Sequence, residues 1–237
     1  PAPHFLIKNS KISLNEPESQ EFIADIKDLK IFLSQKNFFD KEKLYIQKVI
    51  IDKANFSLFK KDIKQVNQYI DYQFSKKKII IKNSNIFFKN NLEEVIAITK
   101  INKAKLIFDD QKISNLFSLK GQMYAVPFVF NFKNSIDLKK SAEFNLKAKS
   151  LKLNIFNKSI KEIDNPTTGM NILSFFNSSL NTKYKFTENI ITFSSEDTKF
   201  NYNGKFSIDP FDINLDVDLG NQVCLLYTSD AADEEDS

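Results

Sequence analysis

Hydrophobic and polar residues alternate in this chain, almost without a break, between positions 198 and 219. Because successive side chains of a β-strand point to opposite faces of a sheet, this pattern predicts strands with one apolar and one polar face. Asp209 and Pro210 interrupt the pattern and divide it into two strands, at 198–208 and 211–219. A third stretch of the same kind covers 123–133. The apolar face of such strands must be covered by the protein's own core, by a partner or by lipid.

The side chains expected on this apolar face are large, and nearly all of them lack polar atoms. Aromatic and branched side chains of this kind favour strands, and they can be placed in an oily environment without leaving a polar group unsatisfied. The candidate lining residues are Tyr124, Val126, Phe128, Phe130 and Phe132 in the first stretch, and Phe200, Tyr202, Phe206, Ile208, Phe211, Ile213, Leu215, Val217 and Leu219 in the other two.

The same reasoning, applied to the whole chain, predicts an all-β protein. We expect an elongated, twisted antiparallel sheet that forms a groove or an open sandwich, with one or two short helices. Helical turns are expected at 62–73, where apolar residues recur at helical spacing, and at 170–179. The expected strands lie near 5–14, 22–33, 44–51, 54–60, 79–89, 94–109, 115–121, 123–133, 142–149, 151–156, 181–187, 189–194, 198–208 and 211–219.

A short internal echo and a change of composition suggest how the chain is organised. Ile-Lys-Asn-Ser occurs at 7–10 and again at 81–84, each time followed by alternating apolar residues, which predicts a repeated hairpin-like unit. We expect a β-groove segment at 1–160, a loop and short helix at 161–180, β repeats at 181–222, and a disordered tail at 223–237. From Cys224 onward the sequence is acidic and resembles a translated sequencing adapter.

The residue types that most catalytic sites need are scarce. The chain has one His, His4, one Cys, Cys224, and four Gly, so a catalytic triad, a zinc site and a glycine-rich phosphate loop are all poorly supported. The acidic row of Asp212, Asp216 and Asp218 has a period of two and is expected on a solvated strand face instead of in a calcium loop. We therefore predict a protein that is not an enzyme and has no cofactor or metal.

Lysine accounts for the positive charge of the chain, which carries a formal net charge of +4 and contains no Arg. A basic protein attracts anionic partners such as lipid headgroups or nucleic acid. A single-strand stacking site needs bases to meet aromatic and basic side chains on one face. Here the alternation places Lys and Phe on opposite faces, so no nucleic-acid partner is expected. No run of about 18 apolar residues occurs, which is the minimum for a membrane-spanning helix.

Four stretches together resemble the AsmA family of Gram-negative envelope proteins, which form repeating β-grooves in the periplasm. PAPHFLIKNSKISL at 1–14 resembles the strand that follows the family's membrane anchor, and KNFFDKEKLYIQKVIIDKANFSLFK at 36–60 resembles its helix-then-strand unit. LKGQMYAVPFVFNFK at 119–133 resembles its glycine-containing strand pair. The segment 180–219 resembles its later repeats, with Gly204 and Pro210 at the turns.

This resemblance implies a lipid-handling role. Members of the family carry an N-terminal helix in the inner membrane, and their groove is thought to carry phospholipid acyl chains toward the outer membrane. By analogy, this chain would be periplasmic, would belong to a longer protein anchored upstream of Pro1, and would use no catalytic residues. Its protein partners are not indicated.

Two other interpretations are compatible with the same alternation. The apolar residues could close over one another as an ordinary sandwich core. The chain could also be a structural β scaffold or a protein-interaction module.

Overall fold

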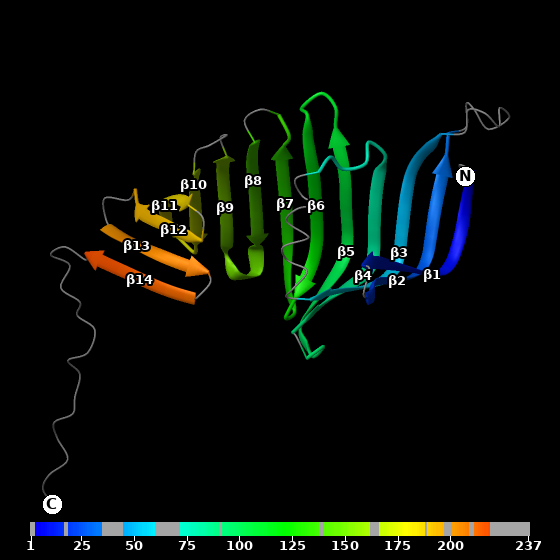
Figure 1. Ribbon diagram of the computed structural model, residues 1–237, viewed down its shortest axis with the longest axis horizontal. Helices are drawn as coiled ribbons and strands as arrows, with labels where there is room; N and C mark the ends of the chain where they lie inside the picture. The colour runs from blue at the N-terminus through cyan, green and yellow to red at the C-terminus, as the bar shows by residue number, and fades with distance from the viewer. Residues whose placement is uncertain are drawn as a thin grey trace, which may run out of the picture.

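The computed structural model describes residues 3–16, 19–34, 45–59, 72–90, 92–137, 140–161, 166–187, 189–196, 201–208 and 211–218. All strands in these ranges belong to one 14-stranded sheet, in which spatial order follows chain order and β1 and β14 are the edges (Figure 1). The expected all-β fold with an open, twisted sheet is confirmed, but one strand pair is parallel instead of antiparallel, and the described residues contain a single 3-10 turn and no α-helix. The strands are β1 (His4–Glu16), β2 (Ser19–Leu33), β3 (Ile46–Phe59), β4 (Lys78–Lys89), β5 (Val95–Asp109), β6 (Ser114–Met123), β7 (Val126–Ser135), β8 (Lys140–Ala148), β9 (Leu153–Lys161), β10 (Thr167–Phe175), β11 (Ser178–Thr187), β12 (Ile190–Ser195), β13 (Asn201–Ile208) and β14 (Phe211–Asp218).

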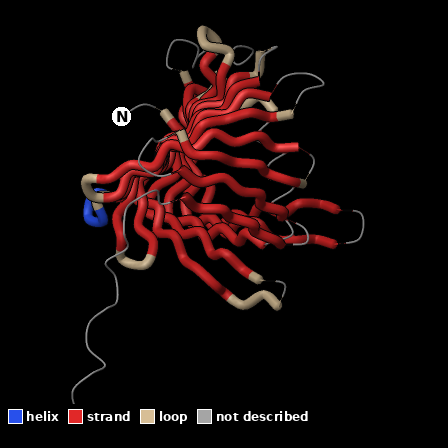
Figure 2. Tube along the Cα trace, turned by 90° about the vertical axis from the view of Figure 1, so that its left-hand side faces the viewer, coloured by secondary structure: helices blue, strands red, loops and turns tan. Residues whose placement is uncertain are grey.

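The twist of the sheet changes the strand direction gradually along its length. In Figure 1 the strands from β5 to β9 stand upright, whereas β13 and β14, at the left, run nearly horizontally. Figure 2, seen from the side of β14, shows the strands fanning out as the sheet twists, with the 3-10 turn Lys149–Leu151 in blue at the left. A consistent right-handed twist between neighbours accumulates in this way over many strands.

Every neighbouring pair is antiparallel except β3 and β4, which are parallel. A parallel pair requires the chain to cross from one rim of the sheet to the other between the two strands. Residues 72–77 complete this crossing. The buried side chain of Asn115 fixes them: Phe74 N donates to Asn115 Oδ1 at 2.7 Å, and Asn115 Nδ2 donates to the Tyr72 carbonyl oxygen at 2.7 Å. The crossing segment is thereby joined to the start of β6.

A row of inserted residues runs across the first five strands. In each of these strands, one residue is left out of the pairing with the neighbouring strand. Before this residue the apolar side chains stand at odd positions, and after it they stand at even positions, or the reverse. Three of the skipped residues have positive φ: 52° at Asn9, 58° at Lys53 and 47° at Asn83. Such insertions bend a strand and let both of its halves present apolar residues to one side. The row is Asn9, Lys27, Lys53, Asn83 and Asn102.

Ser84 replaces ladder hydrogen bonds that this row interrupts between β3 and β4. Its hydroxyl accepts from Ala54 N at 2.9 Å and donates to the Lys82 carbonyl oxygen at 2.6 Å. Ser84 is 2% exposed, so its hydroxyl has little access to water. The repeated Lys-Asn-Ser sequence therefore marks a bend within one long strand, and the expected hairpin-like unit is wrong.

Two further expectations need correction. The loop and short helix expected at 161–180 are wrong, because β10 and the start of β11 occupy most of this range, including the helical turns expected at 170–179. Met170 and Ile172 lie on one face of β10 and Leu173 on the other, which produced apparent helical spacing in a strand that pairs on both sides. The segments expected at 44–51 and 54–60 form one strand, β3. The helical turn expected at 62–73 and the tail at 223–237 lie, wholly or mostly, outside the described residues.

Candidate binding face of the sheet

The register of the ladder assigns each side chain to one of two faces. Residues directly opposite one another on neighbouring strands share a face. Starting from Phe130 of β7, the register leads to Leu119 and Ala104 in one direction and to Leu146 and Ile155 in the other. We call this side of the sheet, from β1 to β14, the apolar face, and the other side the lysine face.

The apolar face is most densely packed over β2–β6. One buried cluster joins Ala24, Ile26, Ile51 and Ala54, and a second joins Ile101, Ala104 and Leu119. Small side chains stand next to the row of inserted residues, with Ala54 fully buried and Ala104 1% exposed. Small residues on the inner side of a bend allow neighbouring strands to approach closely.

All the β7 residues expected on the apolar face lie there. Val126, Phe128, Phe130 and Phe132 are half-buried on this face. The Phe130 ring lies 6.0 Å from that of Phe117 and 5.9 Å from that of Phe144, measured between ring centroids. These contacts make the middle of β7 part of a packed aromatic layer.

The alternation predicts Tyr124 on the apolar face, and this prediction is wrong. It is the first residue of a two-residue turn between β6 and β7, and both Tyr124 and Ala125 have positive φ. Its side chain is 72% exposed, and its hydroxyl donates to the Ile96 carbonyl oxygen at 3.1 Å. Tyr124 stands two residues before Val126, so the alternation assigns both to the same face. The turn was not recognised in the sequence, because a turn in which both central residues have positive φ usually contains Asn or Gly, and this one contains neither.

The C-terminal group also shares the apolar face. Tyr202 and Phe206 of β13 are half-buried, whereas Ile213, Leu215 and Val217 of β14 are 56%, 53% and 51% exposed. Ile208 and Phe211 are paired at the β13–β14 hairpin, and Phe200 and Leu219 lie outside the described residues. Asp212, Asp216 and Asp218 occupy the opposite face, as expected of a solvated row.

Five strands separate the β7 group from the β13–β14 group, a span of about 29 Å at the usual strand spacing. Residues of β8–β12 connect the two groups across this span. They alternate as well, but in shorter runs, and this signal was available in the sequence. The connecting residues on the apolar face include Phe144, Leu146, Leu153, Ile155, Leu173, Leu180, Tyr184, Phe186, Ile191 and Phe193.

A hollow of about 950 Å³ lies on the apolar face near the β14 edge. Six strands and the β10–β11 turn contribute to it, because the twist of the sheet brings β13 and β14 across the ends of β9–β11 (Figure 1). Ser178 and the Tyr202 hydroxyl are the polar side-chain groups of its lining. The lining residues are Leu153, Leu173, Phe175, Phe176, Ser178, Leu180, Phe193, Tyr202, Leu215 and Val217.

The reverse side of the sheet carries many lysines together with apolar residues such as Ile50, Ile80 and Met170. Its lysines stand in cross-strand rows, and some pair with acids, as Lys158 Nζ does with Glu143 Oε1 at 3.2 Å. Both partners are substantially exposed, so such pairs contribute little to stability. The lysines assigned to this face by register include Lys30, Lys48, Lys82, Lys103, Lys105, Lys120, Lys133, Lys147, Lys158, Lys183, Lys185 and Lys205.

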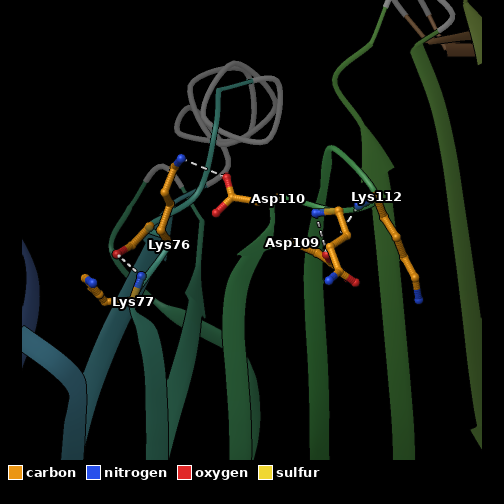
Figure 3. Close-up of polar contacts among 7 residues, drawn as sticks. Lys76, Lys77, Asp109, Asp110 and Lys112 are labelled. Atoms are coloured by element: carbon orange, nitrogen blue, oxygen red, sulfur yellow. Dashed lines mark hydrogen bonds and ion pairs between the residues drawn. The ribbon is translucent and has the colours of Figure 1, made fainter.

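Charges at the upper rim of Figure 1 are engaged with one another. Figure 3 shows Lys76, which precedes β4, reaching Asp110 of the β5–β6 turn, with 2.8 Å between Lys76 Nζ and Asp110 Oδ1. In the same turn, Asp109 Oδ1 accepts from the backbone N–H groups of Gln111 and Lys112, at 3.0 and 3.3 Å. The Asp109 hydrogen bonds fix the turn, whereas the exposed Lys76–Asp110 pair contributes little to stability.

Among the described residues, no group of three or more His, Cys, Asp or Glu side chains is arranged to hold a metal ion. Within the same ranges, no helix is long and apolar enough to span a membrane.

Comparison of the chain with protein-family models finds no match. Comparison with curated proteins likewise finds no significant match. The resemblance to the AsmA family therefore stays a prediction.

Proposed function

We propose that the apolar face binds the acyl chains of phospholipids and that the protein acts without catalysing a reaction. The observation that carries this proposal is the exposed apolar surface over β9–β14. There β14 contributes to the hollow of about 950 Å³, and its Ile213, Leu215 and Val217 side chains are each more than half exposed. Contiguous exposed apolar surface of this kind commonly marks a binding site.

The energetics favour a long flexible apolar ligand. Removing a methylene group from water contributes about 0.8 kcal/mol, so a chain that lies across several strands gains binding energy in proportion to its buried length. The lining carries few polar groups that such a ligand would leave unsatisfied. A small polar ligand would leave most of this surface exposed to water.

The basic character of the protein suits a ligand with an anionic headgroup. Lysines occupy the reverse face and several turns, so a lipid whose tails lie on the apolar face has cations at the rims for its phosphate.

The resemblance to the AsmA family indicates where in the cell this activity would occur. A lipid-binding sheet in the periplasm, held at the inner membrane by an upstream helix, would shield acyl chains between the inner and outer membranes. Membership of the family and location in the envelope belong to the same proposal.

The open edges of the sheet favour a second candidate function. β1 and β14 each have one strand neighbour among the described residues, and an unpaired edge can accept a strand from another protein. A structural scaffold or protein-interaction module would use these edges and would leave the apolar face without lipid.

Lipid capture separates the two functions. The purified chain is delipidated, mixed with phospholipid vesicles, separated from them again, and extracted for mass spectrometry. The proposal expects phospholipid in stoichiometric amounts with the protein. Protein that returns folded but free of lipid would contradict lipid binding and favour the scaffold.

A further inference from the structure

The β8–β9 and β10–β11 turns lie next to one another at one rim of the sheet. Strands β8–β11 are consecutive and antiparallel, so the β8–β9 and β10–β11 turns lie at the same rim. A backbone hydrogen bond connects them, from Phe176 N to the Lys152 carbonyl oxygen at 3.1 Å. We call residues 149–152 and 175–177 the Phe tip.

The Phe tip exposes apolar side chains. Phe175 is 51% exposed, Phe176 59% and Leu151 43%. The two Phe rings meet edge to face, with 4.6 Å between their centroids. Three large apolar residues on two adjoining turns form a patch that water does not favour.

Both charged residues of the Phe tip are lysines. Lys152 Nζ lies 5.1 Å from the centroid of the Phe176 ring, and Lys149 stands in the same turn, also exposed. No Asp or Glu occurs at 145–155 or 171–180. This differs from the upper rim, where Lys76 is paired with Asp110.

The backbone at Phe176 is in an unfavourable conformation for its side chain. Its φ is 52°, and it is the first central residue of a two-residue hairpin turn, a position at which Gly is usual. A bulky residue at positive φ is costly, and conformations of this kind cluster at binding sites. The sequence places an aromatic ring at the outermost point of the turn despite this cost.

We infer that the Phe tip docks on the surface of an anionic lipid bilayer, with Phe175, Phe176 and Leu151 at the level of the headgroups and Lys149 and Lys152 on the lipid phosphates. Aromatic and aliphatic residues flanked by lysines are typical of surfaces that lie in a membrane interface. Phe175 and Phe176 also line the hollow, so docking would bring the hollow next to the bilayer. Only this last consequence rests on the proposed function.

Fluorescence tests the docking directly, because the chain has no Trp. Phe176→Trp and Tyr124→Trp each introduce a single reporter at an exposed aromatic position with positive φ in a turn of the same rim. Vesicles of equal parts phosphatidylglycerol and phosphatidylcholine are added to each variant. We expect a blue shift of emission for Phe176→Trp and none for Tyr124→Trp. An unshifted Phe176→Trp spectrum, or equal shifts in both variants, would overturn the inference.

Co-sedimentation with the same vesicles gives the energetic test. Phe176→Asn removes the ring and suits the turn, and we expect it to weaken binding by about tenfold, since roughly half of a Phe side chain is available for transfer. The double variant Lys149→Gln with Lys152→Gln should weaken binding to the mixed vesicles but not to pure phosphatidylcholine vesicles. Tyr124→Asn should bind like the unaltered chain. Unchanged binding by Phe176→Asn, or a preference for RNA over vesicles that the lysine variant abolishes, would refute membrane docking.

Lipid capture by the same variants distinguishes a failure of membrane docking from a failure of lipid binding. If the apolar face binds lipid and the Phe tip docks, Leu215→Asp loses captured lipid but still sediments with vesicles. If the apolar face does not bind lipid but the Phe tip docks, no variant contains lipid, whereas the variants still differ in their sedimentation with vesicles. If docking alone fails, the unaltered chain contains lipid and Phe176→Asn sediments like it.

Discussion

A single charge on the apolar face of β14 provides the sharpest test of lipid binding. Leu215 is 53% exposed and contributes to the hollow, so a ligand can cover about half of its side chain. Complete burial of a Leu side chain contributes about 1.5–3 kcal/mol, and the exposed half therefore about 1 kcal/mol. Leu215→Asp removes this contribution and places a carboxylate against the acyl chain, at a desolvation cost of several kcal/mol. Together these effects should weaken lipid capture by at least about a hundredfold.

The same exposure predicts that the Leu215→Asp protein folds. Substitutions at exposed positions usually change stability by about 0.5 kcal/mol, and at an edge strand by up to about 1 kcal/mol. Phe130 would be a poorer choice, because its ring packs against Phe117 and Phe144 and a charge there would disrupt the fold.

Asn214→Asp is the matched control, since it introduces the same side chain one residue away, on the lysine face of the same strand. Both variants and the unaltered chain are assayed for captured phospholipid by mass spectrometry and for stability by urea denaturation. Loss of lipid in Leu215→Asp alone, at unchanged stability, is the expected result. Equal capture by all three proteins would refute binding at this face, and unfolding of Leu215→Asp would show that Leu215 belongs to a closed core.

Three further predictions concern the framework of the sheet. Ser84→Ala leaves the N–H of Ala54 unsatisfied in a buried position, and we expect it to lower the free energy of unfolding by about 1–3 kcal/mol in urea titrations. Lys53→Asn, at a φ of 58°, should raise the thermal midpoint, because Asn tolerates positive φ better than Lys; a lower midpoint would show that the Lys53 side chain is itself needed. Gly204→Ala would place a Cβ 2.3 Å from the Asn214 carbonyl oxygen, so it should separate β13 from β14 and accelerate amide exchange there, whereas unchanged exchange would contradict the tight pairing.

Alternation predicted two parts of the candidate face, but it missed the β8–β12 residues between them and most of the residues that line the hollow. It identified the apolar residues of β7 and β14 and placed them on one side, because the period of two survives wherever only one face is apolar. It failed at β10, where Met170 and Leu173 lie on opposite faces, and at Tyr124, where a turn without Gly or Asn interrupts the parity.

Other features depend on relations between distant strands, which one sequence does not contain. The parallel pairing of β3 with β4 depends on a crossing that no local pattern marks. The hollow requires side chains from β9 to β14, and its size depends on the accumulated twist of the sheet. The Lys-Asn-Ser echo was recognised as a repeat, but only the register identifies Asn83 as an inserted residue.

The row of inserted residues has a consequence for how this protein can change in length. Each strand from β1 to β5 carries one extra position, whereas β6 pairs with β5 without one. Deleting Lys53 alone would restore plain alternation from Ile51 to Ala54, so Phe56 would stay on the apolar face and Asn55 on the lysine face. The deletion would remove one of five aligned bends and leave Lys27 and Asn83 beside a straight strand. A change of one residue in length is therefore better tolerated on this line than elsewhere in the same strands, where it would turn half a strand over.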